Sequence, residues 1–240
     1  ETNELTDIKE IVRTRTISNQ KPLCTATLDY PAAIAPQLVK NHKTGEHEIV
    51  IQDTHNQLYL INSSGKILWK KSLSDRIVGN ISQVDLFKNN KLQLAFATKN
   101  QLIVMDRNGN MVSGFPKSFS KSTVCGLTTC DYDKNRDYRF FIPHSDGTIT
   151  LLKSDGSSPS DWQFAGSKGL QNEIQYFNQK GKDFLVTFDK DQCYFLNRKG
   201  QERILSNNSI KKATHGSFYE DVLGSKNRFI CTSPQGNILY

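Results

Sequence analysis

The sequence predicts an all-β fold built from repeated four-stranded antiparallel units. The first observation is a short phrase that ends in a glycine turn and recurs along the chain. Its glycines are Gly65, Gly109, Gly156 and Gly200, spaced 44, 47 and 44 residues apart (109−65, 156−109, 200−156). The second is that each phrase is a short apolar run, such as Leu102–Met105, bounded by Asn and Gly, which is typical of strands. A period of roughly 40–50 residues indicates an array of supersecondary units.

The second unit shows the four parts of a repeat most clearly. Asn108-Gly109 predicts a tight hairpin turn, because both residue types tolerate a positive φ. Pro116 falls in the last strand, which suits an outer edge where a missing N–H is tolerated. The expected elements are strands at 83–87, 92–98, 102–105 and near 111–119, with a polar turn at 88–91.

The third strand of this unit is apolar on both faces. Leu102 and Val104 point one way, whereas Ile103 and Met105 point the other way. A strand that is buried on both sides lies between two other layers. Four-stranded sheets stacked face to face are the blades of a β-propeller, which is therefore the predicted architecture. A solenoid would prefer shorter repeats, and helical repeats are disfavoured by the short strand-like runs.

The two ends of the chain predict how the ring closes. Residues 23–28 lie 45 residues before 68–73 (68−23), in the phase of a fourth strand, and residues 217–240 supply three strands. Together they make one blade, so the sequence predicts five blades closed by N- and C-terminal strands. The alternative is a fragment of a seven- or eight-bladed propeller. Residues 11–17 favour that alternative, because they fall in third-strand phase and would be surplus in a five-bladed ring.

This interpretation gives the expected domain organisation. Residues 1–20 form an N-terminal extension or a surplus strand, and residues 21–240 form a single propeller domain. The expected repeats are about 37–80, 81–126, 127–172, 173–216, and 217–240 completed by 23–30.

The run Asn56–Trp69 resembles the repeat of the quinoprotein-like (PQQ-like) propeller superfamily. That repeat has a Leu-Tyr-Ala-Leu-Asp type run, a Gly-Lys turn and then Leu-Trp; here the matching residues are Leu58-Tyr59-Leu60-Ile61-Asn62, Gly65-Lys66 and Leu68-Trp69. The run Asn108–Pro116 resembles integrin-like repeats of secreted bacterial propellers. The superfamily includes cofactor-bearing dehydrogenases and scaffolds without a cofactor, such as the outer-membrane assembly lipoprotein. The adjacent cysteines that resemble a marker of some quinoprotein dehydrogenases are absent. The resemblance implies the fold and favours the scaffold branch, whereas function does not follow from a fold.

Composition and charge indicate which classes of partner and which location to expect. The net charge is +7 with a pI near 9.1, but no run of Lys or Arg exceeds two residues, so we expect no nucleic-acid partner. No apolar stretch reaches the roughly 18–20 residues of a transmembrane segment. The five cysteines form no Cys-x-x-Cys pattern. The chain begins with Glu1, which suggests a processed or truncated product, and we expect a periplasmic, cell-surface or extracellular location in a bacterial envelope.

One loop has the pattern of a metal site. Asp131, Asp133, Asn135 and Asp137 alternate along the chain, and side-chain oxygens at such spacing can converge on Ca²⁺. Arg136 stands where such loops usually have glycine, and no bidentate Glu follows. The alternative is an Asx-rich hairpin in solvent. Calcium is the one metal ion that the sequence suggests, and no other cofactor is expected.

Acidic residues on the innermost strands offer an enzymatic alternative. Asp85 and Asp131 occupy equivalent places in their repeats (131−85 = 46), and Glu220 and Asp221 lie on the predicted first strand of the last repeat. Inner strands line the axial channel of a propeller, where two carboxylates can act as acid and base or nucleophile on a glycoside. This supports a carbohydrate-active or quinone-dependent enzyme as the alternative function, although no family motif accompanies the acids.

The favoured function is a non-enzymatic scaffold that binds through loops on one rim. The turns at 41–46, 88–91, 134–137 and 179–182 are the expected binding loops, because rigid scaffolds commonly carry function on variable loops. The expected partner is a protein, with a polysaccharide or other domains of a longer chain as alternatives.

Overall fold

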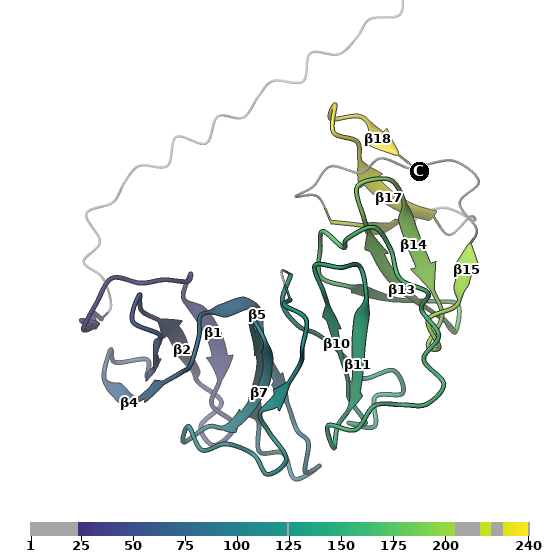
Figure 1. Ribbon diagram of the computed structural model, residues 1–240. Coiled ribbons are helices and arrows are strands. Elements are labelled where there is room, and N and C mark those ends of the chain that lie inside the picture. The colour runs from purple at the N-terminus through teal and green to yellow at the C-terminus, as the bar shows by residue number, and fades with distance from the viewer. Residues whose placement is uncertain (1–23, 124, 205–216, 222–227, 240) are drawn as a thin grey trace, which may run out of the picture.

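The strands of the computed structural model form five antiparallel sheets that follow one another in chain order (Figure 1). The structure describes residues 24–123, 125–204, 217–221 and 228–239, and these residues contain no helix. In each sheet, consecutive strands pair with one another. This arrangement confirms the prediction of an all-β fold made of propeller-type blades.

The sheets differ in strand number. The first has β1 (Gln37–Lys40), β2 (His47–Gln52), β3 (Gln57–Ile61) and β4 (Ile67–Ser72). The second has β5 (Ile77–Val84), β6 (Gln93–Thr98), β7 (Gln101–Asp106) and β8 (Lys117–Ser118). The third has three strands: β9 (Thr128–Cys130), β10 (Arg139–Pro143) and β11 (Ile149–Lys153). The fourth has β12 (Gln175–Gln179), β13 (Lys182–Phe188), β14 (Cys193–Leu196) and β15 (Glu202–Ile204). In the described residues the fifth has β16 (Tyr219–Asp221), β17 (Arg228–Thr232) and β18 (Ile238–Leu239).

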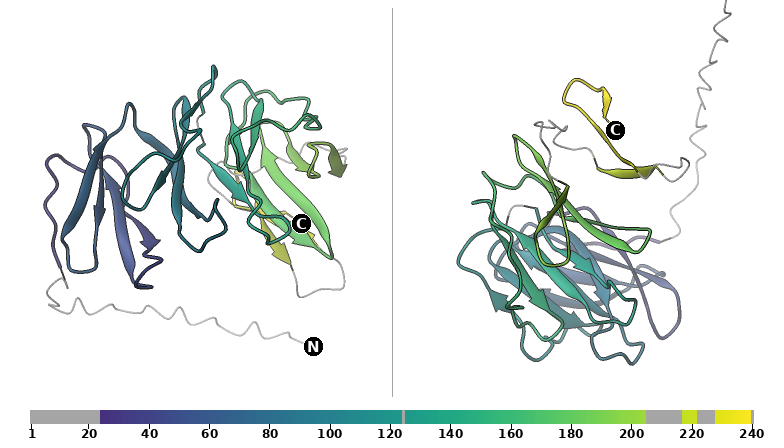
Figure 2. Two further views of the ribbon diagram at one scale, coloured as in Figure 1. Left: turned by 90° about the horizontal axis from the view of Figure 1, so that it is seen from below. Right: turned by 90° about the vertical axis from the view of Figure 1, so that its right-hand side faces the viewer.

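The hydrophobic core lies between consecutive sheets. These sheets stand side by side as layers (Figure 2). On β7, Ile103 and Met105 pack with residues of the first sheet, whereas Leu102 and Val104 pack with residues of the third. All four side chains are buried. The prediction that this strand lies between two other layers is therefore confirmed.

The outer strand of the second sheet is shorter than the sequence predicts. In the second sheet the expected strand near 111–119 is reduced to β8, which begins immediately after Pro116, a residue without an N–H for the ladder. In the third repeat the outer segment packs onto the next sheet: Trp162 and Phe164 join the core between the third and fourth sheets, and the N–H of Gln163 donates to the Lys199 carbonyl (2.8 Å).

The repeated glycines lie where the outer segment of one sheet covers the turn after the third strand of the next. A Cβ atom at Gly109 would lie 3.3 Å from the Trp69 ring, and one at Gly200 would lie 2.8 Å from the backbone nitrogen of Phe164. Gly109 and Gly200 also have φ values of 78° and 79°, in the left-handed region that favours glycine. Close packing between blades and backbone conformation thus both explain the period seen in the sequence.

The first blade receives the same kind of cover from the start of the described chain. A Cβ atom at Gly65 would lie 2.6 Å from the carbonyl oxygen of Thr25, and Asp29 forms an ion pair with Lys70 (2.7 Å). Residues 24–29 therefore lie where the outer strand of a preceding blade would lie. They form no strand and do not pair with β18 in the described residues. Closure of the ring by residues 23–30 stays a prediction, and residues 1–20 lie outside the described residues.

Candidate functional site

The turns between the first and second strands of the second and third blades are held by side-chain caps. Asp85, which is only 3% exposed, accepts hydrogen bonds from the backbone N–H groups of Asn89 (3.0 Å) and Asn90 (2.7 Å). Asp131 accepts the same two bonds one blade later, from Asn135 (3.1 Å) and Arg136 (2.9 Å). Short carboxylates that bind the backbone of their own turn are a common stabilising device.

The two turns also share their backbone conformation. Lys88 and Asn90 have φ values of 54° and 63°, and the equivalent Lys134 and Arg136 have 53° and 65°. Left-handed φ values are uncommon for residues other than glycine. Both turns therefore have one defined structure that their acidic caps stabilise.

An arginine joins the turns of the second and third blades. The guanidinium of Arg136 donates from Nη1 to Asp85 Oδ2 (2.7 Å) and from Nη2 to Asn90 Oδ1 (2.8 Å). The hydroxyl of Tyr138 accepts from the N–H of Asp85 (3.1 Å). The third blade thus contacts both the cap and the tip of the preceding turn.

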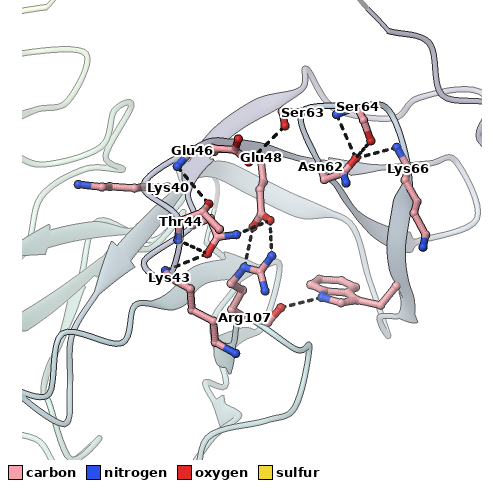
Figure 3. Close-up of polar contacts among 12 residues, drawn as sticks. Lys40, Lys43, Thr44, Glu46, Glu48, Asn62, Ser63, Ser64, Lys66 and Arg107 are labelled. Carbon is pink, nitrogen blue, oxygen red and sulfur yellow. Dashed lines mark hydrogen bonds and ion pairs between the residues drawn. The ribbon is translucent and has the colours of Figure 1, made fainter.

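A second arginine joins the first and second blades (Figure 3). The Arg107 guanidinium donates from Nε to Glu48 Oε2 (2.8 Å) and from Nη2 to Glu48 Oε1. Asn41 Nδ2 also donates to Glu48 (3.1 Å), and Trp69 Nε1 donates to the carbonyl oxygen of Arg107 (2.7 Å). Both the side chain and the backbone of Arg107 are therefore bound to the preceding blade.

A third arginine joins the third and fourth blades. Arg198 makes two hydrogen bonds to Asp133 (2.7 and 3.2 Å), bonds Asp183 of its own blade, and lies over the Tyr132 ring with its central carbon 4.5 Å from the centroid. Burial acts to raise the pKa of Asp183, but hydrogen bonds from Tyr176, Asn178 and Arg198 outweigh it, so the pKa is lowered. The hydrogen bond to Asp133 raises the pKa of Arg198. Asp183 and Arg198 therefore remain charged at neutral pH.

We call Arg107, Arg136 and Arg198 the clamp arginines, and the four first-to-second-strand turns, with the neighbouring turns that carry Arg107 and Arg198, the turn rim. Each clamp arginine comes from the later blade and binds an acid of the earlier one. The clamp arginines therefore link neighbouring blades along the rim, and Arg136 joins the first-to-second-strand turns of the second and third blades directly. The clamp itself was not anticipated, although Arg107 and Arg198 each precede a repeat glycine by two residues (109−107, 200−198).

The predicted calcium ligands do not converge in the structure. Asp131 caps its own turn, Asp133 binds Arg198, Asn135 accepts from the N–H of Asp137 (2.9 Å), and Asp137 pairs with Arg139 (3.1 Å). Among the described residues, no group of three or more His, Cys, Asp or Glu side chains could hold a metal ion. Calcium binding at this loop stays a prediction that would require these contacts to rearrange.

Two acids of the enzymatic alternative have structural partners as well, whereas Glu220 Oε1 is buried without a hydrogen-bond partner among the described residues. Both oxygens of Asp85 and of Asp131 accept hydrogen bonds from their own turns, and Asp85 also binds Arg136. Glu220 and Asp221 lie on β16 in the last sheet. Two of the four predicted axial acids are thus occupied as turn caps.

Comparisons with known proteins support the fold alone. No protein-family profile matches the sequence, and no curated protein is detectably similar to it. Among solved structures, the chain is similar to BBS1N in a complex with ARL6DN, with a TM-score of 0.55, 12% identity, and coverage of 92% of this chain and 68% of that chain. It is also similar to the biofilm matrix protein Bap1 of V. cholerae (TM-score 0.51, 15% identity, 78% and 33% coverage) and to the computationally designed protein Ika4 (TM-score 0.50, 13% identity, 74% and 98% coverage). These neighbours agree with an array of propeller-type blades.

Proposed function

We propose that this chain is a non-enzymatic propeller scaffold whose turn rim binds a protein partner. One observation carries the proposal: Asp85, Asp131 and Asp133, in the turns of the second and third blades, cap those turns or bind clamp arginines, whereas the turn tips are exposed. Lys88, Lys134 and Lys180 lie at these tips and are exposed. The arrangement offers a rigid recognition surface and leaves few carboxylates available for acid–base chemistry.

Rigidity favours binding because a fixed loop loses little conformational entropy when a partner docks. The caps and clamps hold the tips of the second and third blades in defined conformations before any partner arrives. Two structural neighbours are compatible with a binding role: BBS1N was crystallised in a complex with ARL6DN, and Bap1 is a biofilm matrix protein.

The proposed setting is a bacterial envelope, in the periplasm, at the cell surface or outside the cell. The support is the resemblance to PQQ-like and secreted propeller repeats, together with the biofilm matrix neighbour. No helix of the described residues is long and apolar enough to cross a membrane.

Chemical cross-linking in the native envelope fraction, followed by mass spectrometry, tests this function. We expect one protein to cross-link to the wild-type chain. The amount of this cross-linked partner should fall at least tenfold with the double variant Lys88→Glu/Lys134→Glu on the turn rim. The matched control is Lys99→Glu/Lys190→Glu, which reverses exposed charges in second-to-third-strand turns at the other end of the blades. Failure to find a stable partner at any salt concentration, or loss of the partner with the control variant alone, would contradict the proposal.

A further inference from the structure

The turn rim contains a cleft of about 350 Å³ between the first and second blades. It lies beside the Arg107–Glu48 contact shown in Figure 3. The basic and aromatic side chains that line this cleft are His42, Lys43, Phe87, Lys91 and Arg107. The cleft therefore joins basic groups from two blades and one aromatic ring.

The acids in and beside this cleft are already engaged by the protein. Glu48 accepts hydrogen bonds from Arg107 and Asn41, and Asp106 accepts from the backbone N–H groups of Asn108 (2.8 Å) and Asn110 (2.9 Å). These carboxylates therefore have little capacity left for the nearby lysines.

The lysines of the cleft have no carboxylate of their own. Neither Lys43 nor Lys91 belongs to any ion pair among the described residues, and both are exposed. Two ammonium groups without a counter-charge favour an anionic ligand.

The histidine of the cleft contributes a further donor. His42 Nδ1 accepts a hydrogen bond from the N–H of Leu92 (3.2 Å), so a neutral ring carries its proton on Nε2. Burial lowers the pKa of His42, and the charges of Arg107, Lys43 and Lys91 lower it further. Three cationic side chains thus act on the ring, which agrees with a site for an anion.

The aromatic ring of Phe87 indicates that the ligand also carries an apolar group. Phe87 is 59% exposed at the edge of this basic cleft. A side chain of this size normally gains from burial, and aromatic residues, Phe included, are enriched at protein interfaces relative to the rest of the surface. A ligand that pairs with Lys43 and Lys91 and covers Phe87 has carboxylates next to an apolar side chain.

We propose that this cleft binds an acidic peptide segment of a protein partner. Its carboxylates pair with Lys43 and Lys91, and an adjacent apolar side chain packs on Phe87. The volume suits a few side chains of an extended segment. This proposal rests on the proposed function of the turn rim and identifies the kind of sequence that the rim recognises.

Fluorescence anisotropy with a labelled ten-residue peptide of alternating Glu and Leu tests the proposal. We expect binding that weakens at least fivefold with Lys43→Glu, with Lys91→Glu and with Phe87→Ala, and that weakens as salt rises from 50 to 200 mM. Lys190→Glu is the matched control, since it reverses an exposed charge in the second-to-third-strand turn of the fourth blade, away from the turn rim, and it should change the dissociation constant less than twofold.

Three results would overturn the proposal: equal binding of the peptide with Gln in place of Glu, equal weakening by Lys190→Glu, or comparable binding of a ten-nucleotide single-stranded DNA probe. The native cross-linking experiment separates this failure from failure of the proposed function. If the rim variants still lose the native partner while the peptide does not bind, the rim function stands and the acidic-peptide site falls.

Discussion

Replacing Arg107 with methionine tests the energetic role of the clamp arginines. The substitution leaves the Glu48 carboxylate, which is 3% exposed, without its cation, whereas the Arg107 side chain itself is 20% exposed. Removing one partner of a buried ion pair costs about 3–5 kcal/mol. Because Asn41 keeps its hydrogen bond to Glu48, we expect the lower end, about 3 kcal/mol.

Urea unfolding followed by tryptophan fluorescence is a suitable assay, since Trp69 donates to the Arg107 carbonyl. With a slope of about 3 kcal/mol per M, the midpoint should fall by about 1 M. Combining Arg107→Met with Glu48→Gln should cost less than the sum of the single changes, with a coupling energy of about 2 kcal/mol. Lys168→Met, which removes an exposed ion pair with Asp191, is the control and should cost less than about 1 kcal/mol. A cost below about 0.5 kcal/mol for Arg107→Met, or no coupling with Glu48→Gln, would refute the reasoning.

Three further changes test other parts of the structure. Gly200→Ala should destabilise the chain by about 1–2 kcal/mol more than Gly45→Ala, because both residues have φ of 79° but only the Cβ at position 200 meets Phe164; equal costs in urea unfolding would argue against close packing there. Burial acts to raise the pKa of Asp53, but its hydrogen bonds outweigh burial, so the pKa is lowered. The contribution of Asp53 to folding stability is therefore full above about pH 4 and is lost as the pH falls. Asp53→Asn should flatten the fall in stability between pH 5 and 3, and an unchanged slope would contradict this. Calcium bound by the 131–137 loop would stabilise the chain by about 2.7 kcal/mol at a hundredfold excess over Kd, and Asp137→Asn should abolish the effect; an unchanged melting temperature on adding calcium would exclude the site.

The parts of the fold that were predictable depend on local sequence. The third strand of the second blade was expected at 102–105 and is observed as β7, because its apolar residues lie between polar turns. The first strand was expected at 83–87 but is observed as β5, which begins at Ile77. The missed part contains Gly79, with φ of 73°, and a register shift between Val78 and Ser82, so no strand alternation is visible there.

The candidate site was predictable only in outline. The turns of the rim follow from Asn, Asp, Gly and Lys between apolar runs, and the structure places Lys88 and Lys134 at equivalent points of two such turns. The clamps were missed because Arg107 and Glu48 are 59 residues apart, and Arg198 and Asp133 are 65 residues apart. A pairing across blades depends on how the sheets stack, which the local pattern does not specify. For the same reason, the sequence does not show that Asp85 and Asp131 cap their turns or that Asp133 binds Arg198.

Hydrogen–deuterium exchange at the turn rim tests most directly whether the rim is a preformed rigid surface. The backbone N–H groups of Asn90 and Arg136 donate to Asp85 and Asp131, and Arg136 links the two turns. We expect these two amides to exchange at least a hundredfold more slowly than in an unfolded chain, and Arg136→Met to remove most of the protection at Asn90. Exchange of both amides at the unfolded rate in the wild-type protein would contradict the account.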